Sequence, residues 1–216
     1  MAEPVSASEF AASYIRDAIL RNELKPNSRI QQHALAAELG VSHVPLREAI
    51  QMLVAEGFLT TPARRGAFVT PLSEEHVREI FNLRIVLELD MLKNSIPNLT
   101  PEQLSGLNDI CDGENEVSDI IQYGDFNAKF HLALYGGATR PRQIFLIKSL
   151  WNNALRYSTL LRIDGNHFTQ SQAEHRAMVD YACKGDIDGA CGILEEHLSF
   201  ALNRIVSIMQ ENHDVE

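Results

Sequence analysis

The chain has 216 residues and a hydrophobic content of 45%, which is ordinary for a globular protein and excludes a largely disordered one. No apolar run approaches the ~20 residues of a membrane-spanning helix, and the acidic N-terminal segment lacks the pattern of a secretory signal, so we expect a cytoplasmic protein that does not contact a membrane. The net charge of −10 by itself is unfavourable for a protein that binds nucleic acid.

The first 72 residues predict three helices followed by a β-hairpin. Apolar residues recur at helical spacing in three segments, at about 8–22, 31–39 and 43–56. Ser42 is expected to cap the third helix, and Gly57 follows its end. Two short β-prone runs then lie at 58–61 and 67–70, joined by the turn-rich sequence PARRG.

This order of elements is typical of a winged helix-turn-helix. The third helix has the position of a recognition helix, which enters a major groove. Arg64 and Arg65, at the hairpin tip, are placed to reach phosphates, and Gly66 permits a close backbone approach. The alternative is that the two arginines belong to an ordinary solvated turn.

The rest of the chain predicts helices alone. They are expected at about 74–94, 101–112, 114–122, 125–137, 141–163, 169–184 and 186–211. Thr100 and Gln103 form a capping-box pattern at the start of the second of these helices. The fold class is therefore mainly α: an N-terminal winged helix-turn-helix followed by an all-α bundle of six or seven helices.

Charge separates the same two parts of the chain. Residues 1–72 contain 7 Lys and Arg against 7 Asp and Glu, whereas residues 73–216 contain 12 against 22. This asymmetry predicts two domains with different partners, with a boundary near Pro71. The neutral first domain can still present a basic face, because attraction to phosphate depends on nearby charges.

The three cysteines do not suggest a metal or disulfide framework. Cys111, Cys183 and Cys191 have no CxxC spacing. We expect all three to be small buried hydrophobic residues.

The first domain resembles the DNA-binding domain of GntR-type bacterial transcription regulators over the run LAAELGVSHVPLREAIQMLVAEGFLTTPARRGAFVTPL. The helical remainder is similar to the FCD-type effector domain of the FadR- and VanR-like branch. Three segments carry that second likeness: FNLRIVLE, NAKFHLALYGGATRPRQIFLIKSLWNNALRY and EHRAMVDYACKGDIDGACGILEEHL. The resemblance implies a dimeric regulator whose bundle binds a small carboxylate metabolite, often beside a divalent metal.

The resemblance also implies which residues contact DNA. The family's DNA-contacting positions correspond to His33, Ser42, His43, Val44, Arg47 and Gly66. Arg47 is the strongest candidate, because it lies in the first two turns of the recognition helix. The alternative, a solvated arginine paired with an acid one turn away, is disfavoured because Ile50 and Gln51 occupy those positions.

A polar set in the second domain is the candidate metal site. Asn127 and His131 are four residues apart and share a helix face, while His175 and His197 lie on the last two helices. Three imidazoles and one oxygen suit a divalent ion such as Zn or Ni, and they match the family's metal positions. Asn127 stands where many members carry aspartate. Any one of these histidines alone is more typical of an ordinary core or surface residue.

The resemblance further implies that Arg84 faces the effector cavity and binds a carboxylate. The alternative is an ion pair with Glu88, one helical turn later. Arg156 and Tyr157 are additional candidates for the effector pocket.

Our hypothesis is a ligand-responsive repressor that is not an enzyme. A homodimer binds double-stranded operator DNA, and a small organic acid binds the bundle. Two alternatives stay open: a metal-dependent hydrolase-like enzyme, for which no general base is evident, and a DNA-binding scaffold whose bundle holds no metal.

Overall fold

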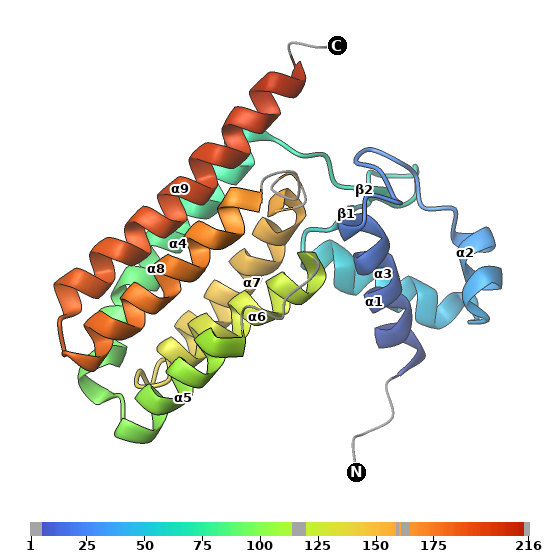
Figure 1. Ribbon diagram of the computed structural model, residues 1–216. Coiled ribbons are helices and arrows are strands. Elements are labelled where there is room, and N and C mark those ends of the chain that lie inside the picture. The colour runs from blue at the N-terminus through green and yellow to red at the C-terminus, as the bar shows by residue number, and fades with distance from the viewer. Residues whose placement is uncertain (1–5, 114–119, 159, 161–164, 214–216) are drawn as a thin grey trace. The chain divides into compact units, whose positions relative to one another are not determined.

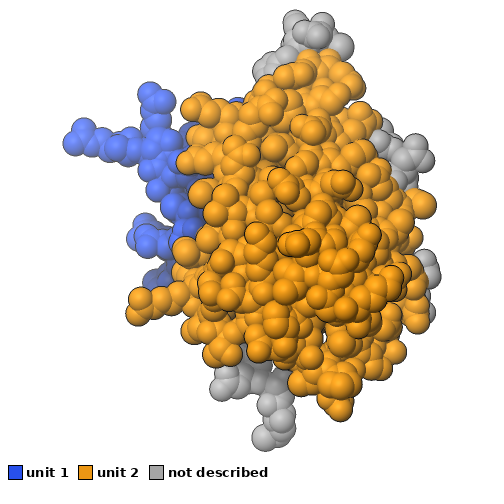
Figure 2. Space-filling model, turned by 90° about the vertical axis from the view of Figure 1, so that its left-hand side faces the viewer, with its two compact units in different colours: residues 1–73 blue, residues 74–216 orange. Residues whose placement is uncertain are grey.

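The protein is described by a computed structural model that covers residues 6–113, 120–158, 160 and 165–213 (Figure 1). The chain divides into two compact units, residues 1–73 and 74–216, which Figure 2 colours separately. Each unit has its own core and is described by itself.

The first unit contains three helices and a hairpin: α1 (Ala7–Leu20), α2 (Gln32–Leu39), α3 (His43–Ala55), β1 (Leu59–Thr60) and β2 (Phe68–Val69). A capping box begins α1, since Ser6 accepts from the amide of Glu9 while Glu9 accepts from the amide of Ser6. Helix α3 packs against α1 through a buried stripe at helical spacing, formed by Leu46, Ala49, Ile50 and Leu53.

A tight glycine turn joins α2 to α3. Gly40 ends α2 with a φ of 65°, a left-handed conformation that costs glycine little because it has no Cβ. Only Val41 and Ser42 then precede α3. The turn therefore fixes α3 immediately after α2, as a helix-turn-helix requires.

The hairpin is antiparallel and shorter than the sequence predicts, because Leu59 pairs with Val69 and Thr60 with Phe68. A third segment extends it. Arg29 forms a bridge to Phe68, and the amide of Ile30 donates to the carbonyl of Ala67 at 2.9 Å. The sequence predicted only a helix break at this segment, because its pairing is a tertiary contact that local patterns do not reveal.

The second unit is a bundle of helices (Figure 1). Its described elements are α4 (Glu74–Ser95), the 3-10 turn η1 (Ile96–Asn98), α5 (Pro101–Gly113), α6 (Ile120–Leu134), α7 (Pro141–Ser158), α8 (Gly165–Cys183) and α9 (Ile187–His213). Helix α4 packs against α7 and α9, α8 packs against α5 and α9, and α5 packs against α6. The predicted fold class, a winged helix-turn-helix followed by a six- or seven-helix bundle, is confirmed.

The structure corrects the predicted break within α6. Residues 120–134 form the single helix α6, whereas the sequence predicted separate helices over 114–122 and 125–137; residues 114–119 lie outside the described residues. Gly124 lies inside α6, and one glycine inside a helix costs only about 1 kcal/mol. A Cβ at Gly124 would lie 2.9 Å from Leu155, so this glycine allows close packing of α6 against α7.

Other local predictions have mixed outcomes. The capping box of α5 is confirmed, because the amide of Gln103 donates to the Thr100 hydroxyl and the amide of Thr100 to the Gln103 side chain. Helix α7 ends at Ser158, short of the predicted 163; residues 161–164 lie outside the described residues. Cys183 is exposed, so its predicted burial is wrong: it is the last residue of α8, where the helix leaves the core.

Across the described parts of the chain, we find no helix with the length and apolar character needed to span a membrane.

Candidate functional site

The recognition helix presents an arginine to solvent. Arg47 is exposed on α3, beside the buried stripe that packs on α1. Within the described part of the chain, no acidic side chain pairs with Arg47. Its guanidinium is therefore available to phosphates or base edges.

The hairpin tip and α3 together border a hollow of about 550 Å³. Arg47 and Gln51 line it from α3, and Arg64 and Gly66 line it from the hairpin. Arg64 and Gly66 both have a positive φ, of 63° and 90°. Both Arg64 and Arg65 are exposed, so the hairpin tip presents two cations beside the recognition helix.

A further cation lies beside Gly66, and the sequence analysis missed it. A Cβ built on Gly66 would lie 3.5 Å from the Nε and Nη2 atoms of Arg29. Arg29 lies three residues before the start of α2, in a segment that pairs with the hairpin through the Arg29–Phe68 bridge and neighbouring backbone hydrogen bonds. Its position depends on this tertiary pairing, so no sequence signal identified it.

The other predicted DNA-contacting residues lie around the start of α3. Ser42 is its N-cap and is exposed, and its hydroxyl does not bond the helix amides. Val44 is 67% exposed. His33 and His43 are exposed and meet edge to face, with ring centroids 4.6 Å apart. All three side chains at the start of α3 are therefore presented on the surface.

In the second unit, the three predicted histidines lie together. His131 comes from α6, His175 from α8 and His197 from α9, and all three are buried. Their ring centroids lie 5.1–5.6 Å apart. One ligand atom from each ring lies within 4.8 Å of the other two. This separation is close enough for small side-chain rotations to place all three around one ion.

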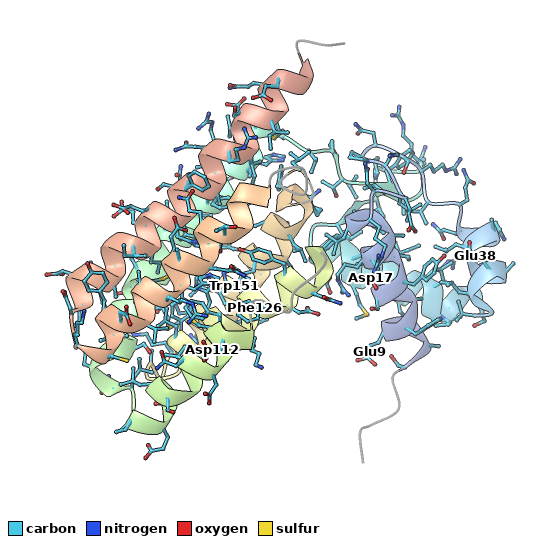
Figure 3. The ribbon with its side chains drawn as sticks, in the orientation of Figure 1. Glu9, Asp17, Glu38, Asp112, Phe126 and Trp151 are labelled. Atoms are coloured by element: carbon cyan, nitrogen blue, oxygen red, sulfur yellow. The ribbon has the colours of Figure 1, made fainter. Side chains whose placement is uncertain are left out.

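Aromatic rings enclose the cluster. Phe130 stacks on His175 at 4.1 Å between centroids. Phe126 and Trp151 are both labelled in Figure 3. The ring centroid of Phe126 lies 6.3 Å from that of His175, and the ring centroid of Trp151 lies 5.9 Å from that of His131. The imidazoles therefore lie in an apolar environment, which disfavours their protonated forms.

The pKa values follow from this burial. Burial lowers the pKa of His131 well below 6.5, and the neighbouring His175 and His197 lower it further. Burial also lowers the pKa of His175, with His197 contributing. At neutral pH, both rings are therefore neutral and can donate a lone pair to a metal ion.

Hydrogen bonds orient two of the rings. The Nδ1 atom of His197 lies 2.7 Å from the Oε2 atom of Glu174. Burial raises the pKa of Glu174, but side-chain hydrogen bonds from His197 and Gln170 help to hold that pKa below 4.5. The ionised carboxylate accepts from Nδ1–H, so the Nε2 lone pair of His197 stays free for an ion. This is the arrangement that orients many metal-binding histidines.

Tyr135 has the corresponding role at His131. Its hydroxyl donates to the Oε2 atom of Glu88 at 2.8 Å, so its oxygen can accept from the Nδ1 atom of His131, 3.4 Å away. The Nε2 atom of His131 is buried without a hydrogen-bond partner among the described residues. A buried polar atom of this kind is costly unless something binds it.

Asn127 has an orphaned atom as well. Its Oδ1 is buried and has no hydrogen-bond partner in the described structure. Asn127 lies one turn before His131 on the same face of α6. Three imidazoles with an amide oxygen are a donor set that suits Zn²⁺ or Ni²⁺, so the residues present fit a divalent ion.

Arg84 forms the ion pair that the sequence analysis gave as the alternative. It is 6% exposed, and its Nε atom donates to Oε1 of the fully buried Glu88 at 2.7 Å. The same carboxylate oxygen accepts from the indole of Trp151 at 3.0 Å. Glu88 therefore links Arg84 to Tyr135 and the histidine cluster.

Arg84 also lines a pocket of about 280 Å³. Asn127, Lys148, Asp125 and Trp151 line the same pocket. Arg84 therefore lines a pocket while its Nε atom is bound to Glu88. Arg156 and Tyr157 are buried and do not line this pocket.

Several of these groups were absent from the predicted site. Tyr135 stands four residues after His131, and Glu174 immediately precedes His175, so their spacing offered a weak signal. Glu174 bonds the histidine of another helix rather than its own neighbour, and that pairing depends on the packing of α8 against α9.

A winged helix-turn-helix with exposed arginines and a separate helical unit with a buried histidine cluster define a DNA-binding regulator with a sensor domain. The comparisons with known proteins agree. The FCD domain model matches residues 79–200, and the model of bacterial regulatory proteins of the gntR family matches residues 7–69. The chain belongs to the GntR family of transcription regulators, in the branch with an FCD effector domain.

Relatives with established names are regulators too. The Nta operon transcriptional regulator of Aminobacter aminovorans is 26% identical over 86% of this chain and 88% of its own. The regulator McbR of Escherichia coli is 31% identical over 59% of each chain. The solved structure of Escherichia coli McbR/YncC covers 97% of this chain and is itself covered completely, with a TM-score of 0.77 and 23% identity. The family and these names favour a regulator over a metal-dependent hydrolase.

Proposed function

We propose that the chain is a homodimeric repressor that binds an operator through α3 and the hairpin, and that responds to a small organic acid bound at a metal site. The observation that carries the sensor part is the meeting of three buried imidazoles from three different helices. Two buried atoms have no hydrogen-bond partner among the described residues: Nε2 of His131 and Oδ1 of Asn127. They support a ligand at that point.

In the DNA-binding unit, Arg47 is placed to contact base edges or phosphates in a major groove. Arg64 and Arg65 reach phosphates beside that groove. The proposed contact surface also includes His33, Ser42, His43, Val44 and Gly66. Arg47 and the two hairpin arginines are exposed, which supports these assignments.

In the sensor unit, His131, His175 and His197 would hold a divalent ion, with Asn127 as an oxygen ligand. When bound, such an ion supplies positive charge and a coordination position for a carboxylate. Glu174 orients the ring of His197, and Glu88 orients both Tyr135 and Arg84. Arg84 and Lys148, which line the adjoining pocket, would bind the remaining oxygens of the acid.

The second copy of the chain has a suitable surface to bind. The packed pair α4 and α7 exposes four large apolar side chains: Leu83, Val86, Phe145 and Leu146. Val86 is 67% exposed and Phe145 is 72% exposed. Such a patch is typical of an association surface, and GntR-family regulators typically form dimers, so we assign it to the homodimer.

Effector binding would change the DNA affinity of this dimer. A ligand can shift an equilibrium only by its different affinity for the two states. We propose that the acid-bound sensor favours a state in which the two recognition helices no longer match the spacing of the operator half-sites.

A thermal-shift screen of organic acids, with and without a chelator, tests this function. A ligand that binds the native state raises the melting temperature. We expect at least one small acid to raise it only when the metal is present, and the same acid to release a labelled operator fragment. Acids that act equally with and without chelator would contradict the metal-dependent sensor.

A further inference from the structure

We propose that the sensor site, as far as the structure describes its residues, has no anionic metal ligand, so that a divalent metal and a carboxylate effector each strengthen the binding of the other. Asn127 is the residue that creates this dependence. The inference rests on the proposed function above, because it takes the three histidines as metal ligands.

Asn127 offers the site a neutral oxygen. Its Oδ1 is buried and has no hydrogen-bond partner in the described parts of the chain, and its residue lines the pocket. An amide oxygen can bind a metal ion, but it carries no formal charge. The three imidazoles are neutral ligands as well.

The two nearby carboxylates, of the half-buried Glu174 and the buried Glu88, are engaged elsewhere. Glu174 accepts a hydrogen bond from Nδ1 of His197. The imidazole ring would therefore separate the Glu174 carboxylate from an ion bound to Nε2. Glu88 accepts from Arg84, Trp151 and Tyr135. Neither carboxylate is therefore available as a direct ligand, and a divalent ion on the four neutral donors keeps its full charge in an apolar environment. A buried charge without a partner is unfavourable.

The pocket beside Asn127 has room for the missing anion. Its volume of about 280 Å³ is near the lower limit of small-molecule sites. Its lining includes the cations Arg84, which is paired with Glu88, and Lys148, together with one acidic residue, Asp125; Lys148 and Asp125 are both exposed. A small carboxylate in this pocket would be attracted both by these side chains and by an ion on the histidines.

Because coupling between two ligands is reciprocal, a metal that binds more tightly with a carboxylate present must also tighten the binding of that carboxylate. Neutral molecules of the same shape should have no such effect. Replacing Asn127 by aspartate would supply the negative charge internally. The variant should bind metal more tightly alone and gain less from an added carboxylate.

Cobalt titration of the full chain tests this inference, because bound Co²⁺ reports its ligands through visible absorption. The dissociation constant of Co²⁺ is measured for the unmodified protein, Asn127→Asp and Asn127→Ala. Each titration is repeated with acetate and with acetamide, its neutral isostere, at equal ionic strength. Circular dichroism checks that each variant is folded.

For the unmodified protein, we expect acetate to tighten Co²⁺ binding by about tenfold, the effect of one well-placed charged ligand, and acetamide to leave it unchanged. Asn127→Asp should bind Co²⁺ about tenfold more tightly without acetate, and its acetate effect should fall below about twofold. Asn127→Ala should keep the acetate effect, because it adds no charge.

Three outcomes would overturn the inference, and they can be distinguished. If Co²⁺ binds and His175→Ala abolishes binding, but Asn127→Asp behaves like the unmodified protein, the metal site stands and the role of Asn127 is wrong. If the unmodified protein binds no Co²⁺, the proposed metal site fails and the inference fails with it. An equal effect of acetamide and acetate would also overturn it.

Discussion

His197 of α9 and Glu174 of α8 are in hydrogen-bond contact, with Nδ1 of the ring 2.7 Å from Oε2 of the carboxylate. The carboxylate fixes which ring nitrogen carries the proton and keeps Nε2 free. Hydrogen-bond partners that orient a metal-binding histidine in this way are commonly worth about 10- to 100-fold in metal affinity.

We therefore expect Glu174→Gln to weaken Zn²⁺ binding by at least about tenfold while the fold is retained. Isothermal titration of the chelator-treated protein measures this affinity. Glu195→Gln, the same change at an exposed position of α9, is the matched control and should leave the affinity unchanged. Equal affinities for both variants would show that the Glu174 contact does not support metal binding.

The position of Arg47 yields a prediction about DNA binding. Arg47→Ala should reduce operator affinity by about 1–3 kcal/mol, the usual contribution of an arginine that contacts a base. Fluorescence anisotropy with an operator fragment measures this loss. Arg142→Ala, which removes an exposed arginine of α7 in the other unit, is the control. Unchanged affinity in Arg47→Ala would refute the assignment of α3 as the recognition helix.

The hairpin arginines should contribute charge without sequence preference. Each phosphate contact adds about 0.9 to the slope of log affinity against log salt concentration. Arg64→Ala and Arg65→Ala should therefore each lower the magnitude of this slope by roughly one unit, on operator and unrelated DNA alike. Anisotropy titrations at several salt concentrations provide the slopes. If both variants keep the slope of the unmodified protein, the hairpin tip does not contact DNA.

The buried histidines predict how stability depends on pH when no metal is bound. Burial lowers the pKa of His131 and His175 in the folded protein, whereas both titrate near 6.5 in the unfolded chain. Below that pH the unfolded chain binds more protons, so the free energy of unfolding should fall as pH falls from 7 to 5. The slope approaches about 1.4 kcal/mol per pH unit for each such histidine.

Urea unfolding of chelator-treated protein at pH 7, 6 and 5 measures this dependence. Unperturbed carboxyl groups titrate near pH 4, below this range, so the histidines are expected to dominate the change between pH 7 and pH 6. His175→Gln removes one titrating group and should have a shallower slope. A free energy of unfolding that is equal at pH 7 and pH 5 would contradict the burial of neutral imidazoles.

Local sequence signals were sufficient for the winged helix-turn-helix. Helix spacing, the turn at Gly40 and the hairpin composition are local features, and the structure places these elements close to the predicted bounds. The pairing of Arg29 with Phe68 is a contact between distant segments. Arg29 was therefore missed at the hairpin, although its charge is plain in the sequence.

In the bundle, the sequence placed the histidines on three helices but could not show that their rings meet. The meeting depends on how α6, α8 and α9 pack, and the break predicted before Asp125 concealed the continuity of α6. The role of Glu88 was only half predicted. Its pairing with Arg84 follows from helical spacing, whereas its bonds to Trp151 of α7 and to Tyr135, just after α6, link segments far apart in the sequence.

The most direct test of this account is a crystal structure of the protein grown with Ni²⁺, with diffraction data recorded at the nickel absorption edge. We expect one anomalous peak per chain, about 2.1 Å from a ring nitrogen of each of His131, His175 and His197. A structure with no peak among these rings, or with nickel bound only elsewhere on the chain, would contradict the proposed metal-dependent sensor.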